Sequence, residues 1–402
     1  MSLRVLHGYV GLFFCAALTF LSITGTLAVF SNEIDWLVRS EMRVAPADEK
    51  APVGQSLDAV RAAQPDAQPI TLVRFPGTRT ADRVLVSAPD AGQRFVWVDP
   101  YSGAVRGTTS MTTVKDVLRE LHRSLSTKDR LVQVVVAAVS VPLALSVVTG
   151  LLIYRRFWTG FFRMPRWSGR RRAVLSDLHR LIAVWSLPFL AAVLFTSLIF
   201  LSEMAGFGPY LRQAPQVEPA RAEALPPGFS GAQLDQAVAL TRARIPGFQL
   251  RDVKFPQTAT QPLSIRGTDG TLLVRSDSSQ LHVDPAALFP VEGTAEPDGV
   301  TLQPAADMGK RLRLFEAVRV VHYGTLAGLP TRILWVVFGL GLTTLGILGA
   351  LVAVERLRKE FEVKGRVARS GVRHVMSGPG VGNWLGLLAI VAAIALAVRA
   401  IA

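Results

Sequence analysis

The sequence is short of the residues that build covalent cross-links and covalent cofactor sites. Its 402 residues contain one cysteine, Cys15, which excludes a disulfide framework and the CxxCH signature of covalent haem attachment. Histidine occurs six times, and Asp, Glu, Lys and Arg together make up 18% of the chain. No GxGxxG follows a predicted strand, so the sequence indicates no flavin or nicotinamide site of its own.

Charge is nearly absent from several long apolar runs. A helix needs about 20 residues to cross roughly 30 Å of hydrocarbon, and five runs are long enough. We therefore expect a membrane α-helical bundle of about five transmembrane helices, with two α+β segments between them. The first run is longer than the apolar part of a typical signal peptide and precedes no clear cleavage site, so we expect it to be retained. The predicted spans are 1–30, 128–154, 176–202, 326–354 and 382–402; the α+β segments are 31–127 and 203–325.

The net charge of +14 is concentrated in two short loops, 155–175 and 355–381. Arg and Lys beside spans are typical of cytoplasmic loops, so the charge favours membrane topology over nucleic-acid binding. The N-terminus is then cytoplasmic, and both α+β segments lie on the opposite side of the membrane. We expect the first loop to contact anionic lipid and to be able to dock an acidic partner. Its arginines are Arg155, Arg156, Arg163, Arg166, Arg170, Arg171 and Arg172.

The chain reads as an internal duplication. LHGYVGL begins at Leu6 and LHRLIAV at Leu178, and in both cases a threonine follows the histidine by 17 residues (24 − 7 and 196 − 179). The two polar segments contain similar motifs, VRFP (73–76) and VKFP (253–256). Within these segments, FVWV (95–98) and TLLVRS (271–276) show the patterning of β-strands.

Four of the six histidines lie at the margins of predicted spans: His7, His122, His179 and His322. Ionisable groups at membrane depth are costly and mark function. Neutral imidazole is well suited to axial ligation of haem iron, and facing histidines from two helices can hold a haem inside a bundle. The topology predicts an inner pair, His7 with His179, and an outer pair, His122 with His322. Interface packing is the alternative for any one of them, and a metal site without haem is another.

LHGYVGL with SITGTLAVF, LHRSL before GLLIYRRFW, DLHRLIAVW, and VHYGTLAGLPTRILWVVFGL (321–340) resemble the PepSY-associated transmembrane family. This group of bacterial inner-membrane proteins includes iron-regulated siderophore reductases. The resemblance implies two haem b groups, and it carries the ligand role to His7, His122, His179 and His322. It also implies electron transfer from a cytoplasmic-side donor to a periplasmic ferric siderophore, reducing Fe(III) to Fe(II). In one departure, Thr196 is followed by Ser197 where the first span has Thr24-Gly25.

Because no donor site is apparent in the chain, the electron donor would be a separate flavoprotein or a membrane quinol. Two other functions remain open. One is a haem-free PepSY-type import helper or regulatory scaffold, and the other is a di-haem protein that donates electrons to a periplasmic partner enzyme. For the siderophore, the candidate contacts in the polar segments are Arg74, Arg94, Trp97, Arg251 and Lys254.

Overall fold

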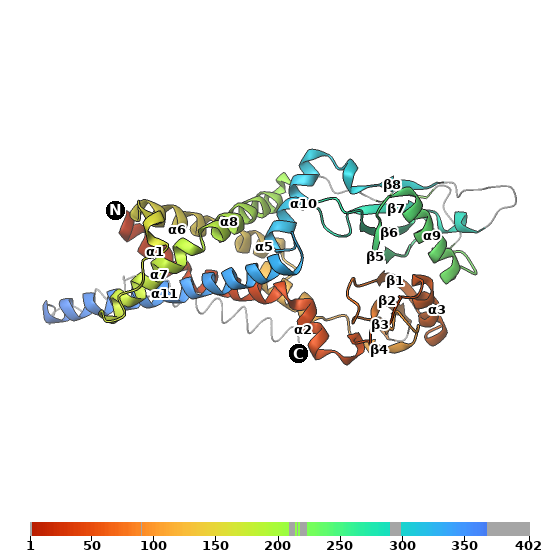
Figure 1. Ribbon diagram of the computed structural model, residues 1–402, viewed down its shortest axis with the longest axis horizontal. Helices are drawn as coiled ribbons and strands as arrows, with labels where there is room; N and C mark the ends of the chain where they lie inside the picture. The colour runs from red at the N-terminus through yellow and green to blue at the C-terminus, as the bar shows by residue number, and fades with distance from the viewer. Residues whose placement is uncertain are drawn as a thin grey trace. The chain divides into compact units, whose positions relative to one another are not determined.

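The computed structural model describes residues 2–89, 91–208, 214, 216–217, 223–289 and 299–367, with side chains described as far as Glu355. The chain forms two compact units (Figure 1). The helical unit comprises Met1–Ser31, Lys115–Gly208 and Val321–Ala402, and the sheet unit comprises Asn32–Val114 and Pro209–Val320.

Long apolar helices dominate the helical unit. Within the described residues, four stretches are long and apolar enough to cross a membrane: Leu3–Val29, Arg130–Ile153, Leu187–Phe207 and Leu329–Glu355. Each of these stretches overlaps one of the predicted spans, and the fifth predicted span, 382–402, lies outside the described residues. The helices of this unit are α1 (Leu3–Val29), α4 (Val114–Ser124), α5 (Arg130–Ala138), α6 (Ser140–Ile153), η2 (Phe157–Gly160), α7 (Arg171–Trp185), α8 (Leu187–Ser202), η3 (Glu203–Phe207) and α11 (Leu329–Val367), with the end of α10 (Lys310–His322).

Two predicted spans are interrupted rather than continuous. The stretch 128–154 divides into α5 and α6 at Val139, and 176–202 divides into α7 and α8 at Ser186. A proline follows each break, Pro142 in α6 and Pro188 in α8. Proline has no N–H to donate and clashes with the preceding turn, which explains why the helix is interrupted there.

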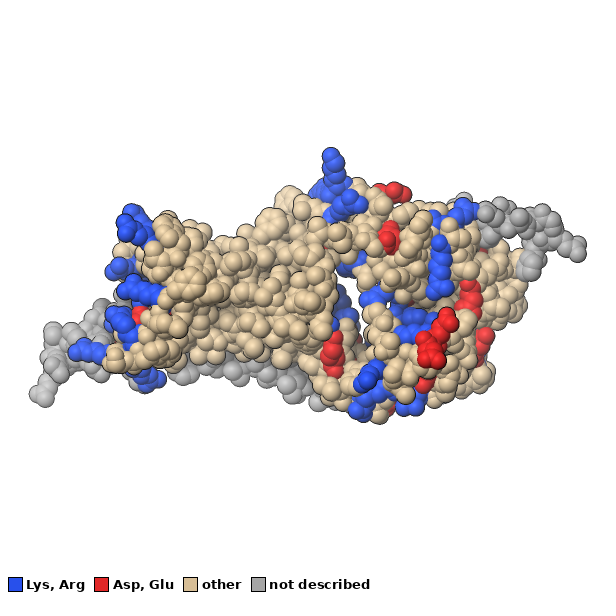
Figure 2. All heavy atoms as spheres, viewed as in Figure 1, with Lys and Arg blue, Asp and Glu red and all other residues tan. Residues whose placement is uncertain are grey.

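Small residues allow α1 and α11 to approach closely. A Cβ atom at Gly339 would lie 2.2 Å from the Oγ1 of Thr26, and one at Gly346 would lie 2.1 Å from the Oγ1 of Thr19. Stripes of small residues are the usual means by which membrane helices pack. On the face seen in Figure 2, a long band of the helical unit carries no Lys, Arg, Asp or Glu. Such a band suits contact with lipid.

The sheet unit is built on one antiparallel sheet of eight strands, in the order β4-β3-β2-β1-β5-β6-β7-β8. The two polar segments, predicted as separate α+β segments, thus share a sheet, with Thr71 of β1 opposite Lys254 of β5. Pairing β1 with β5 covers edges that each half would otherwise expose. The strands are β1 (Gln68–Val73), β2 (Asp82–Ala88), β3 (Gly92–Val98), β4 (Val105–Thr109), β5 (Gln249–Lys254), β6 (Leu263–Thr268), β7 (Ser279–Val283) and β8 (Thr301–Gln303). The helices are α2 (Ser31–Val38), η1 (Ser40–Met42), α3 (Val53–Ala63), α9 (Gly231–Arg244), η4 (Pro285–Leu288), η5 (Ala305–Asp307) and most of α10.

Strand prediction succeeds in one half of the sheet unit and fails in the other. FVWV lies in β3, as predicted, but TLLVRS is a turn rather than a strand. Asp269 accepts a hydrogen bond from the backbone N–H of Thr271, Leu273 has a φ of 61°, and Leu272 is 76% exposed. An Asx-type turn of this kind competes with strand pairing. The segment instead presents Arg275, whose Nε lies 2.8 Å from a carboxylate oxygen of Glu316 in α10.

Helices α3 and α9 meet through two glycines. The N–H of Gly54 donates to Asp235 at 2.8 Å, and the N–H of Gly231 donates to Asp58 at 2.7 Å. A Cβ atom at Gly54 would lie 2.2 Å from the carbonyl oxygen of Gly231. Because that neighbour is backbone, it cannot rotate away, and this contact therefore requires glycine.

Replacing Gly54 with alanine is expected to lower the unfolding free energy of the sheet unit by about 1–3 kcal/mol, the usual cost of forcing extra atoms into a packed contact. Pulse proteolysis of the detergent-purified protein across a urea series measures it. Gly77→Ala is the matched control, because a Cβ there would meet only the Oγ1 of Thr80, at an ordinary 3.5 Å. Equal urea midpoints for the two variants would contradict the prediction.

Candidate functional site: paired buried histidines

Two of the four predicted histidines face each other in the helical unit. His122 lies near the end of α4 and His322 ends α10, and their ring centres are 6.3 Å apart with the planes inclined at 49°. The ring of His322 also packs edge-on against Phe200 at 4.9 Å. The expected outer pair is thus brought together by helices that lie 200 residues apart in the chain (322 − 122).

His7 and His179 lie within electrostatic range of each other. His7 is in α1 and His179 in α7, and the two rings are near enough for the charge of one to act on the other. His7 and Thr24, the contact of His122, are 17 residues apart on α1 (24 − 7). At about 1.5 Å per residue the separation is about 25 Å, so the two histidine pairs lie toward opposite ends of this helix.

Threonine hydroxyls hold three of the four rings by their Nδ1 atoms. The distances from Nδ1 to Oγ1 are 3.0 Å for His7 and Thr149, 3.2 Å for His122 and Thr24, and 2.9 Å for His322 and Thr196. Each hydroxyl donates its own proton to a carbonyl one turn back in its helix, at 2.6 Å from Leu145, 2.9 Å from Phe20 and 2.8 Å from Ala192. The threonine oxygen is therefore left to accept a hydrogen bond from the imidazole.

This bonding assigns the tautomer of the rings. Nδ1 carries the proton and donates it to threonine, so Nε2 of a neutral ring has a free lone pair. For His122 the assignment has a second support, because Nδ1 also lies 3.0 Å from the carbonyl oxygen of Leu21, which can only accept. A histidine whose Nδ1–H is fixed by an acceptor presents Nε2 to a metal in a defined orientation.

Glycines leave room for the rings. A Cβ atom would lie 2.9 Å from Cε1 of His122 at Gly25, 3.5 Å from Cε1 of His7 at Gly150, and 3.7 Å from Cε1 of His179 at Gly349. In two cases the glycine directly follows the threonine that binds the same ring. At the departure noted in the sequence, Ser197 replaces this glycine, yet Thr196 keeps its hydrogen bond to His322.

The donor set fits a macrocyclic cofactor better than a bare metal ion. Among the described residues, no group of three or more His, Cys, Asp or Glu side chains gathers around a common point. A protein zinc site takes four ligands, whereas haem brings four nitrogens and needs only axial partners. A metal bound about 2.0–2.1 Å from each imidazole nitrogen places the ring centres about 6 Å apart. The 6.3 Å between the ring centres of His122 and His322 agrees with this separation.

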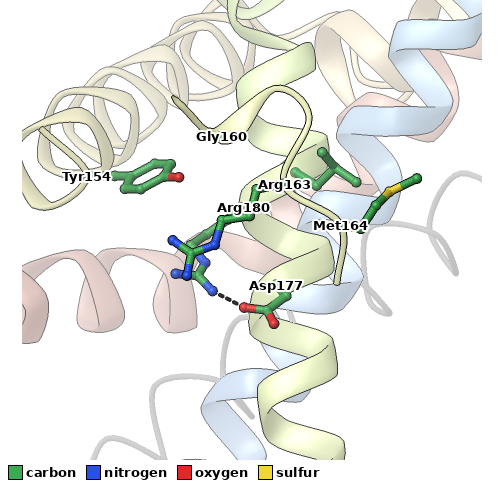
Figure 3. Close-up of a pocket in the computed structure, with 7 residues that line it drawn as sticks. Tyr154, Gly160, Arg163, Met164, Asp177 and Arg180 are labelled. Carbon is green, nitrogen blue, oxygen red and sulfur yellow. Dashed lines mark hydrogen bonds and ion pairs between the residues drawn. The ribbon is translucent and has the colours of Figure 1, made fainter. Parts of the chain in front are cut away.

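Sequence reasoning missed Thr149 and Gly150. The signal was present, because Thr149-Gly150 repeats the Thr24-Gly25 dipeptide at the far end of another span. A third missed residue is Asp177, two positions before His179 and 6% exposed. It pairs with Arg180 of its own helix (Figure 3). It also accepts a hydrogen bond from the Nε of Arg166 at 2.7 Å.

Asp177 therefore ties the basic segment between α6 and α7 to the helix that carries His179. That segment lies at the end of the helical unit that holds the N-terminus, where Figure 2 shows basic side chains gathered. Arg166, which was predicted to contact lipid or a donor, forms an ion pair with Asp177. Arg171 of the same loop lies 3.7 Å from Glu355.

The predicted siderophore contacts divide into two groups. Arg74 is used within the sheet unit, pairing with the buried Asp82 at 2.6 Å, and Trp97 is completely buried with its Nε1 donating to Thr109. Trp97 is thus wrong as a docking contact, because a core ring cannot stack on an external ligand. Arg94 donates to Gln64 at 3.2 Å.

Arg251 and Lys254 remain as candidate contacts that could bind an anionic siderophore. Both lie on β5, and burial lowers the pKa of each side chain from its ordinary value. A nearby anion would oppose that shift and favour the charged forms. His282, by contrast, is a core residue: its Nδ1 lies 2.8 Å from the Oγ of Ser264, and burial lowers its pKa to about 4.

The four apolar spans and the antiparallel sheet unit define an integral membrane protein with a sheet domain. Residues 4–356 match the family described as the PepSY-associated TM region, and the chain belongs to this family. No curated protein matches the chain.

Proposed function

We propose that this protein carries electrons across the bacterial inner membrane through two non-covalently bound b haems and reduces a ferric siderophore on the periplasmic side. His122 and His322 would hold one haem, and His7 and His179 the other. The observation that carries the proposal is the close approach of the two imidazoles of His122 and His322, whose Nδ1 atoms are fixed by threonine so that both Nε2 atoms are free.

When bound, haem supplies one-electron redox chemistry that no side chain in the site provides. The protein's own residues then orient the ligands and exclude water. Thr24, Thr149 and Thr196 accept hydrogen bonds from Nδ1–H, which holds each ring in one rotamer and makes Nε2 a stronger electron donor to a metal. Burial within apolar helices lowers the local dielectric, so the environment of the ligands tunes the potential.

Reduction suits the release of iron from a siderophore. Hard oxygen donors hold Fe(III) strongly and Fe(II) far more weakly, so adding one electron to the iron frees it without destroying the chelator. Arg251 and Lys254 supply positive charge for an anionic chelate in the sheet unit. The basic end of the helical unit supports a cytoplasmic location by the positive-inside rule. Electrons would enter there from a separate flavoprotein or a membrane quinol.

Purified protein is expected to show a Soret band and b-type α and β bands, with two haems per chain by the pyridine haemochrome assay. After reduction with dithionite and removal of the excess, it should release Fe(II) from a ferric siderophore, captured by ferrozine. Spectra recorded before and after addition of the chelate should show reoxidation of the haem. Apo-protein stripped of haem is the control and should release no iron.

The alternative functions give different results in the same experiment. A folded, colourless protein, prepared from cells with ample haem, would favour a haem-free import helper or regulatory scaffold. A protein with two haems that stays reduced in the presence of ferric siderophores would favour electron donation to a periplasmic partner enzyme.

A further inference from the structure

His179 lacks the threonine contact that the other three histidines make. Its Nδ1 is buried and has no hydrogen-bond partner among the described residues. The ring packs instead beside Gly349 of α11, with Cε1 3.7 Å from the position of a Cβ on that glycine. The residue before Gly349 is Leu348, a buried side chain with no polar atom.

Leu348 precedes the glycine beside His179 as Thr149 precedes the glycine beside His7. Gly150 follows Thr149 and packs against His7 just as Gly349 follows Leu348 and packs against His179. The main-chain carbonyl three residues earlier acts on the ring in both places, Ser146 on His7 and Leu345 on His179, but at His179 it does not reach hydrogen-bond geometry with Nδ1. For His122 the same role falls to Leu21, three residues before Thr24. Leu348 is thus the fourth member of a repeated arrangement, with its hydroxyl missing.

The missing hydroxyl changes the ligand. An Nδ1–H that donates to an acceptor gives the imidazole partial anionic character, which stabilises Fe(III) over Fe(II). The pair of His122 and His322 has two such bonds, and the pair of His7 and His179 has one. A buried donor without a partner also costs stability when no cofactor is bound.

We propose that Leu348 is a positioning residue that makes the two haem sites unequal, by withholding a hydrogen bond from His179 and so raising the reduction potential of the haem held by His7 and His179. This inference rests on the proposed function. An electron held at this site then has to reach a site whose two ligands both favour Fe(III). Because the electron moves outward, toward the positive side of an energised membrane, the membrane potential assists that step.

The test is a spectroelectrochemical titration of purified holoprotein carrying Leu348→Thr, compared with Leu348→Val. Threonine and valine have nearly the same shape, so both remove the same volume and only threonine adds an acceptor for Nδ1. We expect Leu348→Thr to lower the potential of one haem relative to Leu348→Val, with the other haem unchanged. Repeating the titration in the His122→Ala background, which retains only the haem of His7 and His179, assigns the shift to that haem.

Removing a threonine hydroxyl should shift the reduction potential in the opposite direction. Thr149→Val removes the hydroxyl from His7 and should raise the potential of the same haem, which keeps the inference testable if Leu348→Thr does not accumulate in membranes. Haem-stripped protein adds a readout independent of activity, since Leu348→Thr should melt at a higher temperature than Leu348→Val. If both haems are bound and the potential of each is the same in Leu348→Thr as in Leu348→Val, this inference alone is overturned. Absence of haem from the wild-type protein would overturn the proposed function together with it.

Discussion

Alanine at His322 is expected to remove one of two haems from the purified protein, and alanine at His122 to remove the same one. The centres of the two rings lie 6.3 Å apart, and the two histidines together would hold one haem. Loss of either ring would leave only one histidine to hold the haem, in a site where truncation of the ring also opens a cavity. The haem content measured by the pyridine haemochrome assay should fall from about two per chain to about one in each variant, because each haem is proposed to need two histidines.

Double variants identify which histidines share a haem. His122→Ala with His322→Ala should still retain one haem, whereas His122→Ala with His7→Ala should retain none. His179→Ala should match His7→Ala. Tyr323→Phe is the control, because this half-exposed neighbour of His322 keeps its ring and loses only a hydroxyl. If the His122→Ala, His7→Ala protein kept one haem, those two residues would share a ligand site and the pairing would be wrong.

Valine at Gly25 is expected to expel the same haem without touching a ligand. A Cβ atom there would lie 2.9 Å from Cε1 of His122, closer than carbon atoms approach without displacement. The ring cannot move freely, because its Nδ1 is held by Thr24 and by the carbonyl of Leu21. We expect haem affinity at this site to fall by about 10- to 100-fold, as is typical when the support of a metal ligand is altered.

Haem titration of stripped protein, followed at the Soret band, measures this loss. Gly11→Val is the matched control: it lies on the same helix, α1, and a Cβ there would meet nothing within 4 Å. Both variants carry the same cost of a β-branched residue in a helix, so the difference between them isolates the contact with His122. Equal haem affinity in the two proteins would contradict the prediction.

The spans were predictable because hydrophobic length is a local property. Four of them agree with the structure to within a few residues at most ends, apart from the two interruptions beside Pro142 and Pro188 and the later start of the Leu187–Phe207 span. Strands were less predictable, since TLLVRS has β-type composition but follows an Asp-Gly turn and is drawn away by the pairing of Arg275 with Glu316. Trp97 was misassigned for a related reason, because an aromatic residue on a strand has the same pattern whether it faces solvent or the core.

The sequence by itself determined that this is a membrane protein, where its spans run, and that its scarce histidines sit at their margins, because apolar length and the cost of burying an ionisable ring are read residue by residue. The tertiary structure alone decided which threonine binds each of three rings, that two polar segments share one sheet, and that Trp97 belongs to the core. These outcomes depend on contacts between helices and strands that lie far apart in the chain, and no local pattern specifies them.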